Sequence, residues 1–300
     1  MNKEPQEKKA NYIHKPVLVN EVIDFLNIQQ GKIYVDCTIG LGGHSLEILK
    51  HLNGRGILIG IDKDKEAVEA AKKKLADFKN CYLFNRDFLE LKDILKSLNV
   101  DKITGGILLD LGVSSLQLED PQRGFSFLRN GPLDMRTSQN ETLTAEKILN
   151  SYNKKDLADI IYKYGEERYS RKIADLVIQK RPIKTTKELA ELVLKCYPKR
   201  YFKVHPATKT FQALRIEVNK ELDNLKSFLC FIPELLEPAS RLTVISFHSM
   251  EDRIVKRFLK DCSKLQILTK KPVTASFLEI KNNPRARSAK LRAAERKWTL

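Results

Sequence analysis

The strongest chemical signal in the sequence is a glycine-rich turn between two acidic strand ends. In the segment DCTIGLGGH, residues 36–44, a short β-forming run ends at an aspartate, the chain turns through three glycines and a helix pattern begins. Glycines allow positive φ and let a ligand lie close to the backbone, and a helix N-terminus adds N–H donors. Asp62 ends the next apolar run, where its carboxylate can accept hydrogen bonds from the hydroxyls of a ribose.

Two cofactors carry a ribose that such a turn could hold: a nicotinamide dinucleotide and S-adenosylmethionine. The dinucleotide fingerprint is G-x-G-x-x-G, and the run that starts at Gly40 has Ser45 where the third glycine would stand. Asp36 precedes the first glycine, where its carboxylate can pair, directly or through water, with the ammonium group of S-adenosylmethionine. The pattern favours methyl transfer and leaves nicotinamide-dependent oxidoreduction open as the alternative.

Polar and aromatic residues also follow the later predicted strands. Phe88 comes after the third strand, where its ring could stack on adenine or fill the core. Asp110 ends the fourth strand and Gln117 follows it, while His248 follows the fifth strand as either a functional or a capping side chain. Because the carboxyl ends of parallel strands meet at one edge of a sheet, we expect these side chains to lie near the glycine turn.

The elements that would position these residues alternate between strand and helix. Such alternation is typical of a parallel sheet that is covered on both faces. We predict strands at 32–36, 56–62, 81–84, 106–110, 242–246, 265–268 and 289–293, and helices at 44–52, 63–78, 209–229 and 251–259.

The alternation breaks between the fourth and fifth strands. Residues 113–140 carry turn signals and predict a long loop, and several helices then follow without a strand between them. Thr144, Asn153 and Thr185 are the N-caps that we expect for three of these helices. We therefore predict an α/β fold in which a Rossmann-like sheet domain, residues 1–112 and 206–300, is interrupted by an inserted loop and helical domain, residues 113–205.

The charge of the chain is concentrated in two blocks. The 54 Lys and Arg residues exceed the 38 Asp and Glu residues by 16, yet residues 1–150 hold 21 of each sign. Residues 151–210 hold 15 basic and 7 acidic residues, and residues 251–300 hold 14 and 5. Because phosphate contacts use Lys and Arg, this distribution predicts a nucleic-acid partner, with a merely soluble basic surface as the alternative.

Several classes of protein are disfavoured by the composition. The five cysteines are scattered and form no C-x-x-C pair, so we expect reduced cytosolic thiols, with no metal site and no disulfide-linked partner. Residues 1–9 are charged, so we expect a short disordered tail and no signal peptide. The apolar runs are too short to cross a bilayer. We therefore expect a cytoplasmic protein without a membrane partner.

Several long strings extend these local signals into a family likeness. They lie at 14–18, 42–44, 106–115, 123–127, 131–136, 164–168, 205–208, 210–213, 245–249 and 283–288. With these strings, the chain resembles the bacterial 16S ribosomal RNA cytosine-N4 methyltransferases from about residue 14 to residue 296. Cys37 departs from the glycine common in that family, and the segment 269–282 looks shorter than in some members.

The resemblance implies a fold, a cofactor, a substrate and a set of contact residues. The fold would be a class I methyltransferase sheet with a helical substrate-recognition domain, and the cofactor would be S-adenosylmethionine. The substrate would be a cytosine in the decoding region of 16S ribosomal RNA, in the context of the small ribosomal subunit. The cofactor contacts that the resemblance assigns are Gly42, Gly43, His44, Asp62, Phe88, Asp110 and Gln117.

The residue that accepts the proton from the cytosine amino group is left open. Amino-methylating DNA enzymes often carry an Asn/Asp-Pro-Pro-aromatic turn after the fourth strand, whereas this chain continues from Asp110 as Leu-Gly-Val. Asp110, Asp134 and His248 are therefore three candidates for this catalytic role. A non-catalytic RNA-binding or ribosome-assembly factor with the same fold is a further alternative, which the complete set of acidic residues and glycines disfavours.

Overall fold

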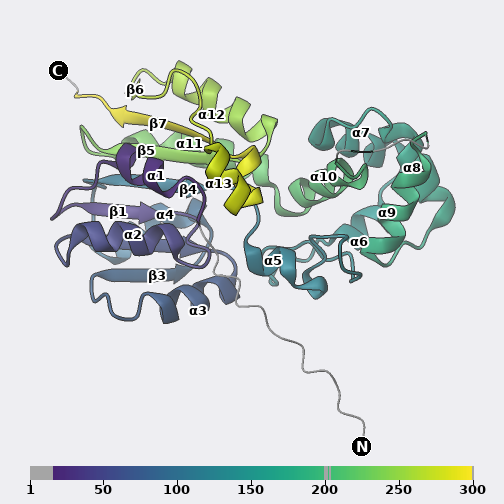
Figure 1. The fold of residues 1–300 in the computed structure, drawn as a ribbon, viewed down its shortest axis with the longest axis horizontal. Helices are drawn as coiled ribbons and strands as arrows, with labels where there is room; N and C mark the ends of the chain where they lie inside the picture. The colour runs from purple at the N-terminus through teal and green to yellow at the C-terminus, as the bar shows by residue number, and fades with distance from the viewer. Residues whose placement is uncertain (1–15, 199–201, 203, 299–300) are drawn as a thin grey trace, which may run out of the picture.

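The computed structural model describes residues 16–198, 202 and 204–298 (Figure 1). The tail expected at residues 1–9 lies outside these residues, as do His14 and Lys15 of the first family-like string. Figure 1 shows the strands gathered on one side of the molecule and a group of helices, α6 to α10, on the other. Among the described residues, no helix is both long and apolar enough to span a membrane.

A seven-stranded sheet in the order β3-β2-β1-β4-β5-β7-β6 forms the larger part of the fold. The strands β1 to β5 run parallel, β7 pairs antiparallel with β5, and β6 pairs antiparallel with β7. The seven predicted strands are confirmed, with bounds shifted by at most a few residues. They are β1 Ile33–Asp36, β2 Ile57–Asp62, β3 Cys81–Asn85, β4 Gly106–Asp110, β5 Arg241–Ser246, β6 Leu265–Ile267 and β7 Lys290–Arg296.

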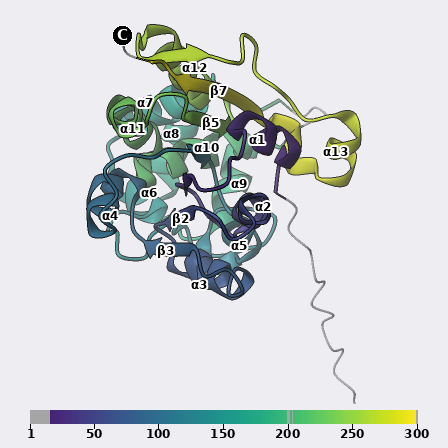
Figure 2. The ribbon, with the colours of Figure 1, turned by 90° about the vertical axis from the view of Figure 1, so that its left-hand side faces the viewer.

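Two sets of helices cover the two faces of the sheet (Figure 2). Consecutive strand residues such as Tyr34 and Val35 belong to opposite cores, as the pleat requires. Because both faces are buried there, β1, β2 and β4 are apolar up to the aspartate that ends each of them. One face packs against α1 Val19–Leu26, α2 Gly43–Leu52 and α3 Lys65–Lys74, and the other against α4 Leu91–Ser97, α11 Glu221–Leu235 and α12 Ser249–Asp261.

The helices between β4 and β5 build a separate hydrophobic core. The predicted N-caps are confirmed, because the side chains of Thr144, Asn153 and Thr185 each accept a hydrogen bond from a backbone N–H in the first helical turn. The helices of this core are α6 Ala145–Ser151, α7 Lys154–Gly165, α8 Ser170–Lys180, α9 Thr186–Lys195 and α10 Ala207–Asn219.

The long helix predicted at 209–229 is wrong, because the chain forms two helices there. α10 ends at Asn219, Lys220 adopts a left-handed conformation with φ of 51°, and α11 starts at Glu221. α10 packs on the helical core through Phe211 and Leu214, whereas α11 packs on the sheet. A single straight helix could not reach both cores, so the chain changes direction at Lys220.

Short elements were also missed by the sequence interpretation. The predicted loop 113–140 contains the helix α5 Ser115–Glu119 and the 3₁₀ turn η2 Pro121–Arg123, and α3 ends earlier than expected. A helix of one or two turns offers too few residues to show a periodic apolar pattern. The other unpredicted elements are α1, α4, α13 Phe277–Asn282, η1 Phe88–Glu90 and η3 Pro284–Ser288.

Candidate functional site

A cavity of about 320 Å³ lies where the carboxyl edge of the sheet meets the helical part of the chain. This volume is in the range of small-molecule sites. Its sheet side is lined by residues that follow β1, β2 and β4, and its other side by residues around the break between α10 and α11. Of the residues predicted for a cofactor, Gly43, His44, Asp62, Phe88, Asp110 and Gln117 line it, and Gly42 adjoins them.

The glycine turn after β1 has the geometry that its residues predicted. Gly42 caps α2 in a left-handed conformation with φ of 70°. A Cβ atom on Gly43 would lie 3.0 Å from Cγ of Pro16, so the close packing of the turn favours glycine there too. Asp62 holds the turn, because its Oδ2 accepts the Gly40 N–H at 3.0 Å and its Oδ1 accepts the Asp64 N–H at 2.9 Å.

Asp36 is buried and Asp62 half-buried at this edge, and their carboxyls face different partners. Burial raises the pKa of each to about 6. Asp62 lines the cavity, whereas Asp36 lies behind it and accepts hydrogen bonds from the Ser45 hydroxyl at 2.7 Å and the Thr38 N–H at 3.2 Å. The sequence suggested that Asp36 pairs, directly or through water, with a bound ammonium group; in the structure its side chain ties the glycine turn to α2.

Asp110 is a half-buried carboxyl with one oxygen that lacks a hydrogen-bond partner. Its Oδ1 has no hydrogen-bond partner, although it is buried in the wall of the cavity. Burial, together with the negative charges of Asp36 and Glu251, raises the pKa of Asp110. His44 lies beside it, with Nδ1 3.6 Å from Asp110 Oδ2 and Nε2 2.8 Å from the Val17 carbonyl oxygen. A buried, unsatisfied acceptor of this kind fits a cationic or donor ligand.

Phe88 and Gln117 line the cavity from short elements. The ring of Phe88 packs edge-on against Phe228, with ring centroids 4.9 Å apart, and η1 is fixed by a capping box between Asp87 and Glu90. Gln117 is buried in α5, and its Nε2 donates to Asp64 Oδ2 at 2.7 Å. Phe88 therefore both completes the core and borders the cavity, so the two interpretations of its ring are compatible.

Asp134 and His248 do not line the cavity. The carboxylate of Asp134 is held by the guanidinium of Arg136, with a closest distance of 2.6 Å. His248 caps α12, and its Nε2 lies 3.1 Å from Oε1 of Glu251. Of the three candidates for proton acceptor, the structure brings only Asp110 to the cavity wall.

The side of the cavity that faces the helical core contains polar residues that sequence reasoning missed. Arg215 and Glu221 form a pair with two hydrogen bonds of 2.8 Å, and Asn219 and Asn224 lie nearby on either side of the helix break. The signal in the sequence was a cluster of polar residues inside an otherwise amphipathic helix pattern. Such a cluster was uninterpretable without the break at Lys220.

Within the described part of the chain, one group of side chains could hold a metal ion by distance alone. One possible ligand atom from each of Glu221, His248 and Glu251 lies within 4.8 Å of the others. Glu221 is already paired with Arg215. Burial would raise the pKa of Glu251, but the hydrogen bond and charge of His248 and the charge of Arg215 lower it overall. Because Glu221 pairs with Arg215 and Glu251 lies beside His248, we assign no metal to this cluster.

Comparisons with known proteins agree over nearly the whole chain. A family model for the MraW methylases matches residues 11–297. Two proteins named ribosomal RNA small subunit methyltransferase H are each 50% identical to this chain. The protein from Koribacter versatilis aligns over 95% of both chains, and that from Thermosipho africanus over 94% of this chain and 97% of its own. A solved rRNA methylase from Streptococcus thermophilus overlays with a TM-score of 0.41 at 13% identity, covering 95% of this chain and 99% of its own, a likeness too loose to carry an argument.

Proposed function

This chain belongs to the MraW methylase family, and on that premise we propose that it methylates the N4 amino group of a cytosine in the decoding region of 16S ribosomal RNA. Family membership makes it an S-adenosylmethionine-dependent methyltransferase and decides against the nicotinamide-dependent and non-catalytic alternatives. To this activity the proposal adds the substrate, which is 16S ribosomal RNA, the target base, which is a cytosine, and the atom that is methylated, which is N4. The relatives named as small-subunit ribosomal RNA methyltransferases support the RNA.

The residues of the cavity fit S-adenosylmethionine. When bound, this cofactor supplies a methyl group on a positively charged sulfur. The unpartnered Oδ1 of Asp110 is the observation that carries the assignment, because a buried acceptor beside carboxylates favours a cation. Asp62 offers acceptor oxygens to ribose hydroxyls, Phe88 offers a ring to adenine, and the Gly42–Gly43 turn and Gln117 complete the wall.

The chemistry asked of the protein is to position a weak nucleophile and to take up a proton. The lone pair of the cytosine amino group is delocalised into the ring. A hydrogen bond donated by this group to an acceptor localises the lone pair on the nitrogen. Asp110 is placed for this role by its position at the cavity wall, and its raised pKa makes it a stronger base than an ordinary aspartate. Asp134 and His248 would require movement of the loop or of the N-terminus of α12 to take part.

The helical part of the chain is the proposed substrate half. We propose that residues 113–205 recognise the RNA, in the context of the small ribosomal subunit in the cytoplasm, and that the basic blocks 151–210 and 251–300 contact its phosphates. α10 belongs to the same hydrophobic core although it follows residue 205. It therefore links this half to the cavity through Arg215 and Asn219.

Mass spectrometry of 16S ribosomal RNA from cells without this protein tests the proposal. One cytosine of the decoding region should lose a methyl group on N4, and the wild-type gene should restore it. The isosteric variant Asp62→Asn should restore it poorly, whereas Asp77→Asn, which changes an exposed carboxylate outside the cavity, should restore it fully. An unchanged methylation pattern in cells lacking the protein would reject the proposed substrate.

A further inference from the structure

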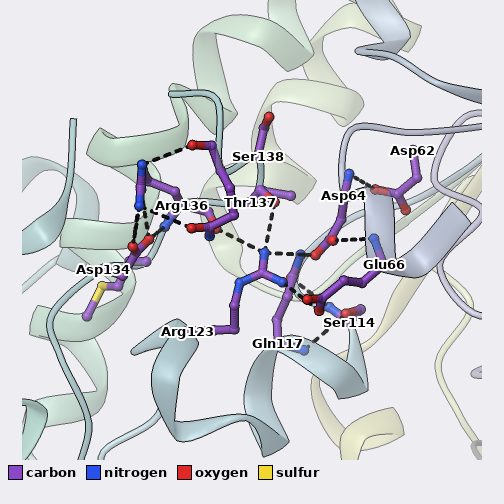
Figure 3. A network of polar contacts seen from close by, with 12 residues as sticks. Asp62, Asp64, Glu66, Ser114, Gln117, Arg123, Asp134, Arg136, Thr137 and Ser138 are labelled. Carbon is purple, nitrogen blue, oxygen red and sulfur yellow. Dashed lines mark hydrogen bonds and ion pairs between the residues drawn. The ribbon is translucent and has the colours of Figure 1, made fainter. Parts of the chain in front are cut away.

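A buried arginine joins the two halves of the cavity wall behind its surface (Figure 3). Arg123 lies in η2, just after α5, with only 6% of its surface exposed. Its Nη2 donates to Asp64 Oδ2 at 2.9 Å, to the Thr137 carbonyl oxygen at 2.9 Å and to the Arg136 carbonyl oxygen at 3.2 Å. Its Nη1 donates to Glu66 Oε2 at 3.2 Å. One guanidinium therefore contacts both α3 of the sheet domain and the loop that leads into the helical core.

On the sheet side, these contacts lead to the proposed ribose site. Asp64 caps α3, is only 3% exposed, and donates its own N–H to Asp62 Oδ1 at 2.9 Å. The Oδ2 atom that binds Arg123 also accepts Gln117 Nε2 at 2.7 Å. Asp62 and Gln117 line the cavity, whereas Asp64 does not. The position of Asp64 thus fixes two wall residues at once.

On the insert side, the same contacts lead to α10. The Thr137 N–H donates to Asn219 Oδ1 at 2.8 Å, and Asn219 Nδ2 donates to the Met135 carbonyl oxygen at 2.8 Å. The Met135 N–H returns to the Arg123 carbonyl oxygen at 2.9 Å, so both the backbone and the side chain of Arg123 hold this loop. Met135 has a φ of 61°, a conformation that a non-glycine residue keeps only when its surroundings fix it. Thr137 and Asn219 line the cavity.

The physical character of the group suits a rigid link. A guanidinium is planar and carries its donors in fixed directions, so it bridges several acceptors at set distances. Its partners Asp64, Thr137 and Arg136 are held by capping or backbone bonds of their own. A displacement at Asp62 is therefore passed through Asp64 and Arg123 to the loop and to Asn219, with few torsions to absorb it.

We propose that Arg123 is a positioning residue that couples occupation of the cofactor site to RNA binding on the insert side. The proposal rests on the proposed function, since it requires an RNA substrate. When a ligand fixes Asp62 and Gln117, Arg123 holds the 135–137 loop and Asn219 in one arrangement, and the RNA then meets an ordered wall. Linkage requires that RNA in turn tightens cofactor binding by the same factor.

The test measures this coupling in the full-length protein. Small ribosomal subunits from cells lacking the protein are titrated with and without saturating S-adenosylhomocysteine, and the ratio of the two dissociation constants gives the coupling. We expect a ratio of at least about 5 for the wild type. Arg123→Lys keeps the charge near Asp64 but loses the fork that reaches the two carbonyls, so its ratio should fall toward one. Its S-adenosylhomocysteine affinity in the absence of RNA should stay within about threefold of wild type, a difference of less than about 1 kcal/mol.

Arg136→Lys is the matched control. The side chain of Arg136 binds Asp134, Gln139 and Glu141, all within its own loop, so this variant loses a guanidinium fork without cutting the link between the halves. Its coupling ratio should stay at the wild-type value. Asp64→Asn cuts the link from the sheet side and should lower the ratio as Arg123→Lys does. It also serves in place of Arg123→Lys if that variant does not fold.

The outcomes separate this inference from the proposed function. If wild-type protein does not methylate the subunits, the proposed function is wrong. If it methylates them but its coupling ratio is one, or if Arg123→Lys and Asp64→Asn keep the wild-type ratio, the positioning role of Arg123 is wrong. An equal loss of coupling in Arg136→Lys would also overturn it, because the effect would then come from loosening of the loop in general.

Discussion

Replacement of Asp62 by asparagine tests the core of the cofactor assignment. The two carboxylate oxygens already accept the N–H groups of Gly40 and Asp64. In the variant, the Nδ2 group of asparagine must face one of these donors, so only one acceptor oxygen remains for the backbone and the ribose. A hydrogen bond to a charged acceptor contributes about 1.5–3 kcal/mol. We therefore expect S-adenosylmethionine binding to weaken by about 2–3 kcal/mol, or about 30- to 150-fold in Kd.

The pH dependence of binding gives this prediction a second readout. Burial raises the pKa of Asp62 to about 6, and hydroxyl donors bind the ionised form. Wild-type affinity should therefore fall as the pH is lowered through about 6, because binding must then release the proton of Asp62. Below this pH, each such carboxyl contributes up to about tenfold in Kd per pH unit. Asp62→Asn should lose this contribution.

Isothermal titration calorimetry at pH 8, 6 and 5 measures both effects. Asp77→Asn is the control, because it removes one negative charge from an exposed position outside the cavity. Wild-type affinity in Asp62→Asn at pH 8, or an unchanged pH slope, would refute the argument that this carboxylate holds the ribose.

Three further predictions concern the catalytic proton acceptor, the pH dependence of the stability of the cofactor-free protein, and the salt dependence of RNA binding. Asp110→Asn should lower the single-turnover rate at saturating cofactor by at least about 100-fold, because general-base catalysis supplies a factor of this size; an unchanged rate would direct attention to Asp134 and His248. The pKa of Asp36 is raised from 3.8 to about 6, so the folded state binds its proton more tightly than the unfolded state, and the stability this proton provides is lost as the pH rises through about 6. In urea unfolding of the cofactor-free protein, wild type should therefore gain about 1 kcal/mol relative to Asp36→Asn between pH 7 and pH 5, and an equal response of both proteins would argue against this linkage. RNA affinity should fall with salt at a log–log slope of about 0.7–0.9 per phosphate neutralised, while cofactor affinity should hardly change, and filter binding across a salt series would expose a flat RNA response.

The sequence by itself determined the elements whose signals are local. The glycine turn after β1 could be predicted because positive φ is a property of single residues, and Gly42 adopts it. The caps at Thr144, Asn153 and Thr185 could be predicted because each side chain bonds a backbone N–H only a few residues away. The parallel strands could be predicted because burial on both faces leaves a continuous apolar run. The positions of Asp62 and Asp110 at the carboxyl edge of the sheet could be predicted because each residue ends a parallel strand.

Only the tertiary structure decided which of the candidate residues share a site. The helix break at Lys220 occurs because α10 packs on the helical core and α11 on the sheet. No local residue pattern shows that these two cores are separate. The same break brings Asn219 to the cavity, and the packing of other elements places Asp134 and His248 outside it. Arg123 binds Asp64, which lies 59 residues before it in the chain, and Thr137, which lies 14 residues after it. Hydrogen bonds of this kind are set by the distances between packed elements, and those distances exist only after the sheet and the helical core have folded against each other.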